Sequence, residues 1–218
     1  MRTNTINTSA PSARLYVHVV LDRSGSMQTC ADDAVGGYNT YVAQLPATAR
    51  VSLTLFDSEG IDLVCDALEP AAASLPIGEF QPRASTPLYD AIGYTVVEVE
   101  KRSTGFDRVA LVILTDGFEN ASTHFKRADI LKLLREKQER DGWLVIYLGA
   151  NQDAWVVGEQ FGTVADNSLS VESGQFSVAL DSVSRATRSY TESSNRQTGR
   201  ALSGFSREDR ARAKRRQD

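Results

Sequence analysis

Three short apolar runs, rich in β-branched residues, stand out along the sequence. They are Leu15–Leu21, Val109–Leu114 and Leu144–Leu148. Uninterrupted runs of this kind are typical of parallel strands that are buried on both faces of a sheet. Val51–Phe56 alternates more, which predicts a strand with one less buried face, and the turn Asp-Ser-Glu-Gly separates it from Ile61–Leu68. We therefore expect an antiparallel hairpin at one edge of the sheet.

Segments with helical periodicity lie between these strands. Leu88–Lys101 follows Thr86-Pro87, a capping residue and a proline that suits a first turn. Further helices are expected at Ala34–Leu45, Lys126–Arg140, Asp153–Phe161 and Gln175–Arg196. Strands that alternate with helices predict an α/β fold. We expect a Rossmann-like, doubly wound, mainly parallel central sheet with one antiparallel edge strand and helices on both faces.

Length and composition add a domain count and a cellular setting. The chain has 218 residues, of which 41% are hydrophobic and 24% are charged, and this suits one domain with its own core. We expect a flexible leader over residues 1–13, one domain over residues 14–198 and a basic tail over residues 199–218. Two cysteines are too few for a disulfide framework. Since no signal peptide or membrane-spanning run is recognisable, we expect a cytoplasmic location.

Charge is distributed unevenly along the chain. The net charge is −4, but the segment from Gly199 onward carries seven basic and three acidic residues, which gives the tail +4 and the rest −8. An acidic body is poorly suited to nucleic acid, so nucleic acid is not expected as a partner. The tail is expected to be solvated, and it alone could touch an anionic surface.

A polar turn directly follows the first buried strand. Asp22, Ser24 and Ser26 occupy alternate positions in it, and Gly25 permits a tight bend between the two serines. Alternate side chains of an extended turn point the same way, so one carboxylate and two hydroxyl oxygens can converge on one point. An oxygen-only set of this kind suits a small hard cation.

Two other turns are expected to bring ligands to the same place, because open α/β sheets bind ligands at the carboxyl ends of their strands. Thr86 precedes a long helix, and Asp116 follows the strand Val109–Leu114 within Thr115-Asp116-Gly117. Two carboxylates and three hydroxyls would hold Mg²⁺, with Mn²⁺ or Ca²⁺ as alternatives. Such a set leaves one coordination position open for a carboxylate oxygen from outside.

At these residues the chain resembles the von Willebrand factor A family. Residues 22–26 match the family's first metal-site motif, Asp-x-Ser-x-Ser, while Thr86 matches its threonine loop and Asp116 its aspartate loop. The resemblance covers roughly residues 14–162. It implies a complete metal-ion-dependent adhesion site, in which Ser24 and Ser26 ligate directly and Thr86 and one aspartate exchange between direct and water-mediated contact. The compact form without a signal peptide resembles a bacterial or phage intracellular member.

The resemblance implies a protein-binding module, for adhesion or scaffolding, and no enzyme. The cation would bridge to an Asp or Glu of a partner protein, and intracellular relatives often work beside an ATPase or in a multi-protein complex. A membrane partner is not expected. Phosphatases of the aspartyl-phosphate type need a second aspartate two residues after the first, and that position is Ser24. A Mg²⁺-dependent, phosphatase-like hydrolase and a structural subunit with a stabilising metal site are the alternatives.

Other residues near the turns carry further predictions. His18 is expected to be a packed core histidine, and His124 an exposed loop histidine. Arg23 and Phe118 are the non-ligating residues of the metal turns, so they could touch a partner. The pair Glu119-Asn120 either adds negative potential around the ion or belongs to a solvated loop.

Overall fold

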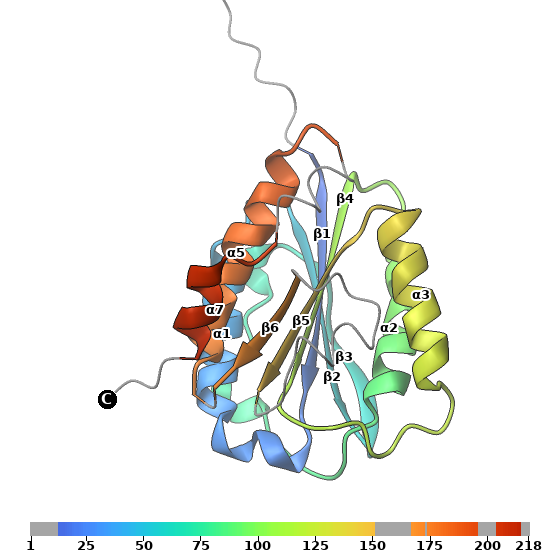
Figure 1. The fold of residues 1–218 in the computed structure, drawn as a ribbon, viewed down its shortest axis with the longest axis vertical. Coiled ribbons are helices and arrows are strands. Elements are labelled where there is room, and N and C mark those ends of the chain that lie inside the picture. The colour runs from blue at the N-terminus through green and yellow to red at the C-terminus, as the bar shows by residue number, and fades with distance from the viewer. Residues whose placement is uncertain (1–12, 151–166, 173, 196–203, 215–218) are drawn as a thin grey trace, which may run out of the picture.

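The apolar runs form the centre of a six-stranded sheet in a computed structural model, which describes residues 13–150, 167–172, 174–195 and 204–214 (Figure 1). The strands are β1 (Leu15–Asp22), β2 (Arg50–Asp57), β3 (Gly60–Leu68), β4 (Arg108–Thr115), β5 (Leu144–Ala150) and β6 (Ser168–Val171). Their order is β3-β2-β1-β4-β5-β6, and neighbours are parallel except for β2 and β3. The expected Rossmann-like sheet with one antiparallel edge strand is confirmed.

Helices cover both faces of the sheet. One face carries α1 (Ala31–Ala43), α5 (Phe176–Glu192) and α7 (Arg207–Ala213), and the other carries α2 (Leu88–Arg102) and α3 (Arg127–Glu139) (Figure 1). Each face encloses its own apolar cluster, so alternate residues of β1 enter different clusters: Val17 and Val19 face α1 and α5, while Tyr16 and Val20 face α2. Every residue of β1, β4 and β5 is buried, which explains why these strands show no polar alternation.

The antiparallel strand β3 lies at the edge of the sheet, where β2 is its single partner among the described strands. Its register against β2 shifts where Leu53 and Thr54 face Cys65 and Leu63, so the strand is irregular at this point. Val64 and Leu63 are partly exposed. β3 is therefore an edge strand, as the hairpin-like turn predicts.

Several element boundaries differ from those expected. A 3₁₀-helix over Gly25–Thr29 precedes α1, which begins at Ala31 and not at Ala34. The strand β6 was not predicted, because its four residues SLSV give no clear periodicity. The helix expected at Asp153–Phe161 lies outside the described residues.

Part of the segment expected to be a solvated basic tail is folded, which corrects that prediction. The helix α7 begins at a capping box in which Ser206 Oγ accepts from Asp209 N at 3.1 Å. Asp209 Oδ1 accepts from Ser182 Oγ on α5 at 2.8 Å, and Ala213 is fully buried. Asp209 and Ala213 therefore dock this helix against the domain. The excess of basic residues in the segment had favoured a solvated tail, and it gave no sign of these two contacts.

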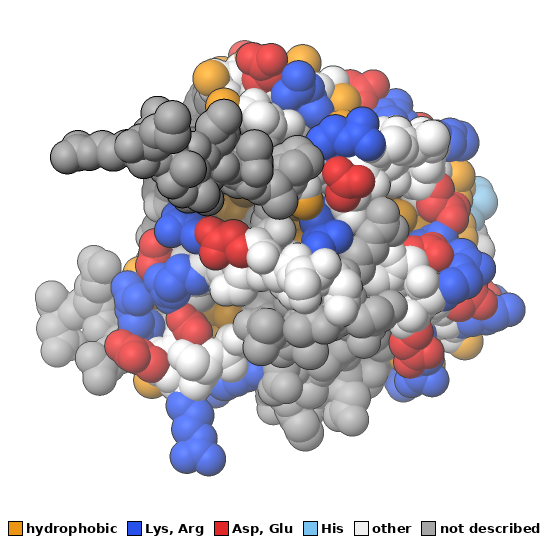
Figure 2. Space-filling model, turned by 90° about the horizontal axis from the view of Figure 1, so that it is seen from above, with side chains coloured by type: hydrophobic (Ala, Val, Ile, Leu, Met, Phe, Trp, Pro, Cys, Tyr) orange, Lys and Arg blue, Asp and Glu red, His pale blue; other side chains and the backbone are white. Residues whose placement is uncertain are grey.

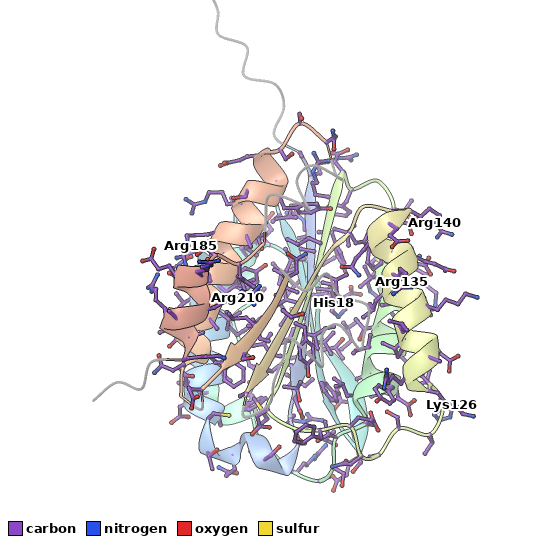
Figure 3. All side chains as sticks on the ribbon, in the orientation of Figure 1. His18, Lys126, Arg135, Arg140, Arg185 and Arg210 are labelled. Carbon is purple, nitrogen blue, oxygen red and sulfur yellow. The ribbon has the colours of Figure 1, made fainter. Side chains whose placement is uncertain are left out.

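A histidine lies in the middle of the sheet, as the label in Figure 3 shows. His18 on β1 is fully buried, and its Nε2 is 2.8 Å from Thr54 Oγ1 on β2. The adjoining Tyr16 hydroxyl donates to Ser52 Oγ at 2.8 Å. Burial lowers the pKa of His18 to about 3, so the ring is neutral at physiological pH. The expectation of a packed core histidine is confirmed.

The surface at the end of the sheet where the strands begin carries mixed charge. Figure 2 looks onto that end, and its described part shows Lys and Arg side chains interspersed with Asp and Glu. Cys30 and Cys65 are both free thiols. Among the described residues, no helix has the length and apolar character needed to cross a membrane.

Candidate metal centre

Asp22 ends the central strand β1, so the carboxyl ends of β2 and β4 flank it. Its side chain is fully buried, and Oδ1 accepts from Ser24 N at 2.7 Å while Oδ2 accepts from Thr115 Oγ1 at 2.5 Å. Burial raises the pKa of the Asp22 carboxyl to about 6, and the nearby Asp116 adds to the rise. Burying a carboxylate without a positive partner is costly, and no basic side chain of the described residues hydrogen-bonds to Asp22.

The two serines of the first turn face the second carboxylate. Ser24 Oγ and Ser26 Oγ are 3.2 Å apart, and Ser26 Oγ donates to Asp116 Oδ1 at 2.6 Å. Burial also raises the pKa of Asp116. A serine that gives its proton to a carboxylate keeps its oxygen lone pairs for a cation. The hydrogen bonding is therefore compatible with cation binding by the same hydroxyls.

Thr86 completes the cluster from a separate loop. A Cβ atom placed on Gly117 would lie 2.8 Å from Thr86 Oγ1, 3.3 Å from Ser26 Oγ and 3.5 Å from Asp22 Oδ2. Three oxygens from two loops therefore surround one point beside a third loop, and the missing side chain of Gly117 leaves room there. In the described part of the chain, no three His, Cys, Asp or Glu residues gather as a metal cluster. A cation site here has to use hydroxyl groups as well.

The five residues predicted to hold a cation are thus brought together at the carboxyl edge of the sheet. They are Asp22, Ser24, Ser26, Thr86 and Asp116. The oxygens are those that Mg²⁺, Mn²⁺ and Ca²⁺ accept as ligands, so the residues fit such an ion. That they ligate one stays a prediction.

Two residues that position the cluster are not evident from the sequence alone. Thr115 holds Asp22 through its hydroxyl, and the same Oγ1 accepts from Gly117 N at 3.0 Å. Asn120 clamps Thr86: its Oδ1 accepts from Thr86 N at 2.8 Å, and its own N–H donates to Thr86 O at 3.1 Å. The only sequence signal for Asn120 is its place four residues after Asp116.

Glu119 has a different role from either of those expected. Its Oε2 accepts from Tyr89 N at the start of α2 at 2.9 Å, and its Oε1 accepts from Ala121 N at 2.9 Å and from Ser122 N at 2.7 Å. The carboxylate thus satisfies backbone donors that have no helical partner. Glu119 therefore fixes the loop after β4 against α2.

The two candidates for partner contact have opposite environments. Arg23 is bound within the protein: its Nε lies 2.7 Å from Asp57 Oδ2, and its Nη2 lies 2.7 Å from Asp62 Oδ2. These two ion pairs hold the Arg23 side chain against the protein, and its contact with a partner stays a prediction. Phe118 is 65% exposed directly beside the cluster, and this residue keeps that role as a prediction. His124 is exposed, as expected, with its Nδ1 3.3 Å from Asp90 Oδ2.

The chain is similar to several solved structures. It aligns with a von Willebrand factor type A protein from Catenulispora acidiphila at 16% identity and a TM-score of 0.60, covering 82% of this chain and 43% of that one. The pilus adhesin SpaC from Lactobacillus rhamnosus GG aligns at 15% identity and a TM-score of 0.66, covering 84% of this chain and 31% of that one. The manganese-loaded TRAP protein from Plasmodium vivax aligns at 15% identity and a TM-score of 0.51, covering 63% of this chain and 57% of that one.

The chain has the von Willebrand factor A fold. No protein-family model matches its sequence, and no curated protein does. At identities of 15% and 16% the likeness concerns the fold alone, and this chain spans less than two thirds of each of these three solved chains. Within this von Willebrand factor A fold, the cluster around Asp22 lies at the edge where parallel sheets bind their ligands.

Proposed function

We propose that the chain is a protein-binding module that holds one Mg²⁺ and offers it to a carboxylate of a partner protein. The observation that carries the proposal is the meeting of Asp22, Ser26 and Thr86 oxygens around the point beside Gly117. The adhesin and the manganese-loaded protein among its structural neighbours support it, since one is named for adhesion and the other carries a divalent ion.

Each residue of the cluster has a distinct task in this proposal. Ser24 and Ser26 offer hydroxyl lone pairs, while Asp116 holds the Ser26 proton and so orients that oxygen. Asp22 supplies buried negative charge, which the ion offsets. Thr86 completes the set, and Asn120 keeps it in place. When bound, the ion supplies a positive point for an incoming Asp or Glu oxygen, and the exposed ring of Phe118 adds apolar contact.

The setting of this module is also proposed. We expect it to act in the cytoplasm of a bacterium or phage-infected cell, within a multi-protein complex or beside an ATPase. The described surface at the opposite end of the sheet has mixed charge, which favours a protein partner over a nucleic acid or an anionic membrane (Figure 2).

Calorimetry tests the metal half of the proposal. Mg²⁺ and Mn²⁺ are titrated into metal-stripped wild type, Asp22→Asn, the double variant Ser24→Ala/Ser26→Ala, and Asp32→Asn. Asp32 is an exposed carboxylate in the first turn of α1, so its variant is the matched control. We expect saturable binding by wild type and control only. If none of the four proteins binds metal, the proposed metal site is overturned, and the turn with Asp22, Ser24 and Ser26 is only a helix-capping turn.

Partner capture separates the binding module from its two alternatives. Partners retained from a lysate with Mg²⁺ and released by EDTA support bridging by the ion, provided that Asp32→Asn behaves as wild type does. A structural subunit would lose stability in EDTA but keep its partners. Magnesium-dependent hydrolysis of phosphate esters that disappears in Asp22→Asn would favour the phosphatase-like enzyme, which the two carboxylates alone make difficult.

A further inference from the structure

A hollow of about 510 Å³ adjoins the candidate metal centre. Its walls are the β2–β3 turn, the first turns of α2 and the loop after β4. Pro87 in its wall follows Thr86 directly, and the turn is joined to the same loop because Ser58 N donates to Ser85 O at 2.9 Å. A partner that reaches Thr86 therefore passes next to this hollow.

The walls combine an apolar lining with excess negative charge. Ile61, Pro87 and Ala121 are apolar, and the lining includes the three carboxylates Asp57, Glu59 and Asp90. A fourth carboxylate, Asp62 on β3, lies outside the lining and is joined to Asp57 through Arg23. Two guanidinium groups pair with these carboxylates: Arg23 with Asp57 and Asp62, and Arg83 with Asp57 and Glu59. The four carboxylates and the two guanidinium groups together carry a net charge of −2. The metal centre does not balance this excess, because its own two carboxylates match the charge of one divalent ion.

The four carboxylates differ in how far the protein already uses them. Asp57 is fully buried between Arg23 and Arg83, and Asp90 accepts from the backbone N–H groups of residues 123–125. Glu59 is different, because its side chain is 60% exposed and lies 3.3 Å from Arg83 Nε at its Oε2. Glu59 is therefore the acceptor that faces a ligand.

An aromatic side chain forms the opposite wall. Tyr94 is 41% exposed, and its ring stands edge-on to Phe125 with the centroids 5.4 Å apart. The His124 ring lies 5.8 Å from it at a tilt of 59°. A ring held on two sides in this way offers a fixed face to a cation. Apolar walls, a fixed ring and a carboxylate suit a side chain with an apolar stem and a positive, planar tip.

We propose that this hollow binds an arginine side chain of the partner whose carboxylate meets the metal ion. The arginine stem lies on Ile61 and Pro87, its guanidinium stacks on Tyr94, and its N–H groups donate to Glu59. The partner segment thus carries an acid and a base within a few residues of each other. The pairing of the two rests on the proposed function, whereas the arginine site itself does not.

The arginine site is tested with small probes on the full chain. N-ethylguanidinium and its neutral analogue N-ethylurea are titrated into ¹⁵N-labelled protein, with and without Mg²⁺, and the amide shifts of Gly60, Thr123 and His124 are followed. We expect saturable shifts with the guanidinium only, weakened at least ten-fold in Glu59→Gln and in Tyr94→Ala. Glu79→Gln, at an exposed carboxylate outside the hollow, is the control.

The results distinguish this site from the metal centre. Equal shifts with N-ethylurea, no shift up to 100 mM guanidinium, or no effect of Glu59→Gln would each overturn the arginine site, whatever the metal titration gives. Guanidinium binding that persists in metal-stripped protein and in Asp22→Asn would support it even if no metal binds.

Short peptides test whether one partner uses both sites. Acetylated peptides carry aspartate and arginine, in either order, separated by one to four alanines, and each is compared with the peptide in which neutral citrulline replaces arginine. We expect the best peptide to lose at least ten-fold in affinity for the Mg²⁺-loaded protein on this exchange. If no arginine peptide binds more than two-fold better than its citrulline form, the shared partner is ruled out.

Discussion

Two buried polar clusters lie on the same strand, four residues apart, and they are built on different principles. The first joins Tyr16, His18, Ser52 and Thr54 in the middle of β1 and β2. It contains hydroxyls and one neutral imidazole, and they satisfy one another. The second lies at the end of β1 and contains two carboxylates, which within the described part of the chain accept hydrogen bonds from hydroxyls and backbone N–H groups alone.

The difference lies in charge and not in burial. Burial lowers the pKa of His18 to about 3 and raises that of Asp22 to about 6, so in both cases it disfavours the ionised form. A neutral histidine needs nothing more than its hydrogen bonds. A buried carboxylate is stabilised as an anion by hydrogen bonds from several donors, as at Asp90, or by nearby positive charge. The first cluster is thus complete within the protein, whereas we propose that a cation completes the second.

The largest expected effect concerns the second cluster. In wild type, a cation at about one hundred times its Kd should stabilise the fold by about 2.7 kcal/mol, which raises Tm by roughly 5–10 °C for a chain of this size. Asp22→Asn should abolish this rise, and Asp32→Asn should keep it. Thermal unfolding in Mg²⁺ and in EDTA measures both. A rise that survives in Asp22→Asn would place the ion elsewhere.

The next effect concerns the first cluster, where stability depends on a side chain that stays neutral and not on a bound charge. His18 is neutral in the fold, whereas in the unfolded chain it takes up a proton below a pKa of about 6.5, so its contribution to stability is lost as pH falls. Between pH 7 and pH 5 this loss is about 2 kcal/mol. His18→Gln should remove that part of the pH dependence, although it weakens packing at all pH values.

Urea denaturation of both proteins at pH 7 and pH 5 measures the difference. The stability lost on acidification should be smaller in His18→Gln by the amount given, whatever the absolute stability of the variant. Equal losses in the two proteins would mean that His18 is accessible to protons in the fold, and the contrast between the clusters would fail.

A smaller effect is expected from filling the space within the second cluster. The Cβ of Gly117→Ala would lie 2.8 Å from Thr86 Oγ1, so the threonine must move away. We expect cation affinity to fall about ten-fold, or about 1.4 kcal/mol, with the fold retained. Gly78→Ala is the control, because its Cβ would meet nothing within 4 Å. Calorimetry with Mn²⁺ decides, and unchanged affinity in Gly117→Ala would remove this point from the site.

The smallest effect concerns the clamp on Thr86. Asn120→Ala removes one side-chain hydrogen bond to the Thr86 backbone and should cost about 1 kcal/mol of stability and a few-fold in cation affinity. Asn39→Ala is matched to it, because Asn39 makes the same kind of bonds to Leu75 far from the cluster. Both variants should lose stability, but only Asn120→Ala should bind Mn²⁺ more weakly. Equal affinities in the two variants would leave Asn120 a purely structural role.

The parts of the fold that could be predicted are those with a local cause. The runs around Val17, Val112 and Ile146 could be predicted as buried strands. A short, uninterrupted apolar run is typical of a strand whose two faces are both covered by helices. The five cluster residues could be named because each follows or precedes a predicted element at a fixed distance.

The remainder depends on contacts between distant segments. The ion pair between Arg23 and Asp57 joins residues 34 positions apart, and the bond from Asn120 to Thr86 spans the same distance. Neither pattern has a local signature, so these two contacts could not be predicted from the sequence. The docking of α7 could not be predicted for the same reason, since Asp209 and Ser182 are brought together only by the tertiary fold.

The helix α7 also determines how copies of this sheet can meet. Arg210 Nη1 donates to Ser168 O on β6 at 2.7 Å, and Glu172 N donates to Ala213 O at 2.9 Å, so this side of the sheet is covered. Of the described strands, β3 alone presents an open edge. Growth of a filament by strand pairing needs two open edges on each copy. Strand pairing through β3 alone would therefore join no more than two copies, edge to edge, and would not extend into a filament.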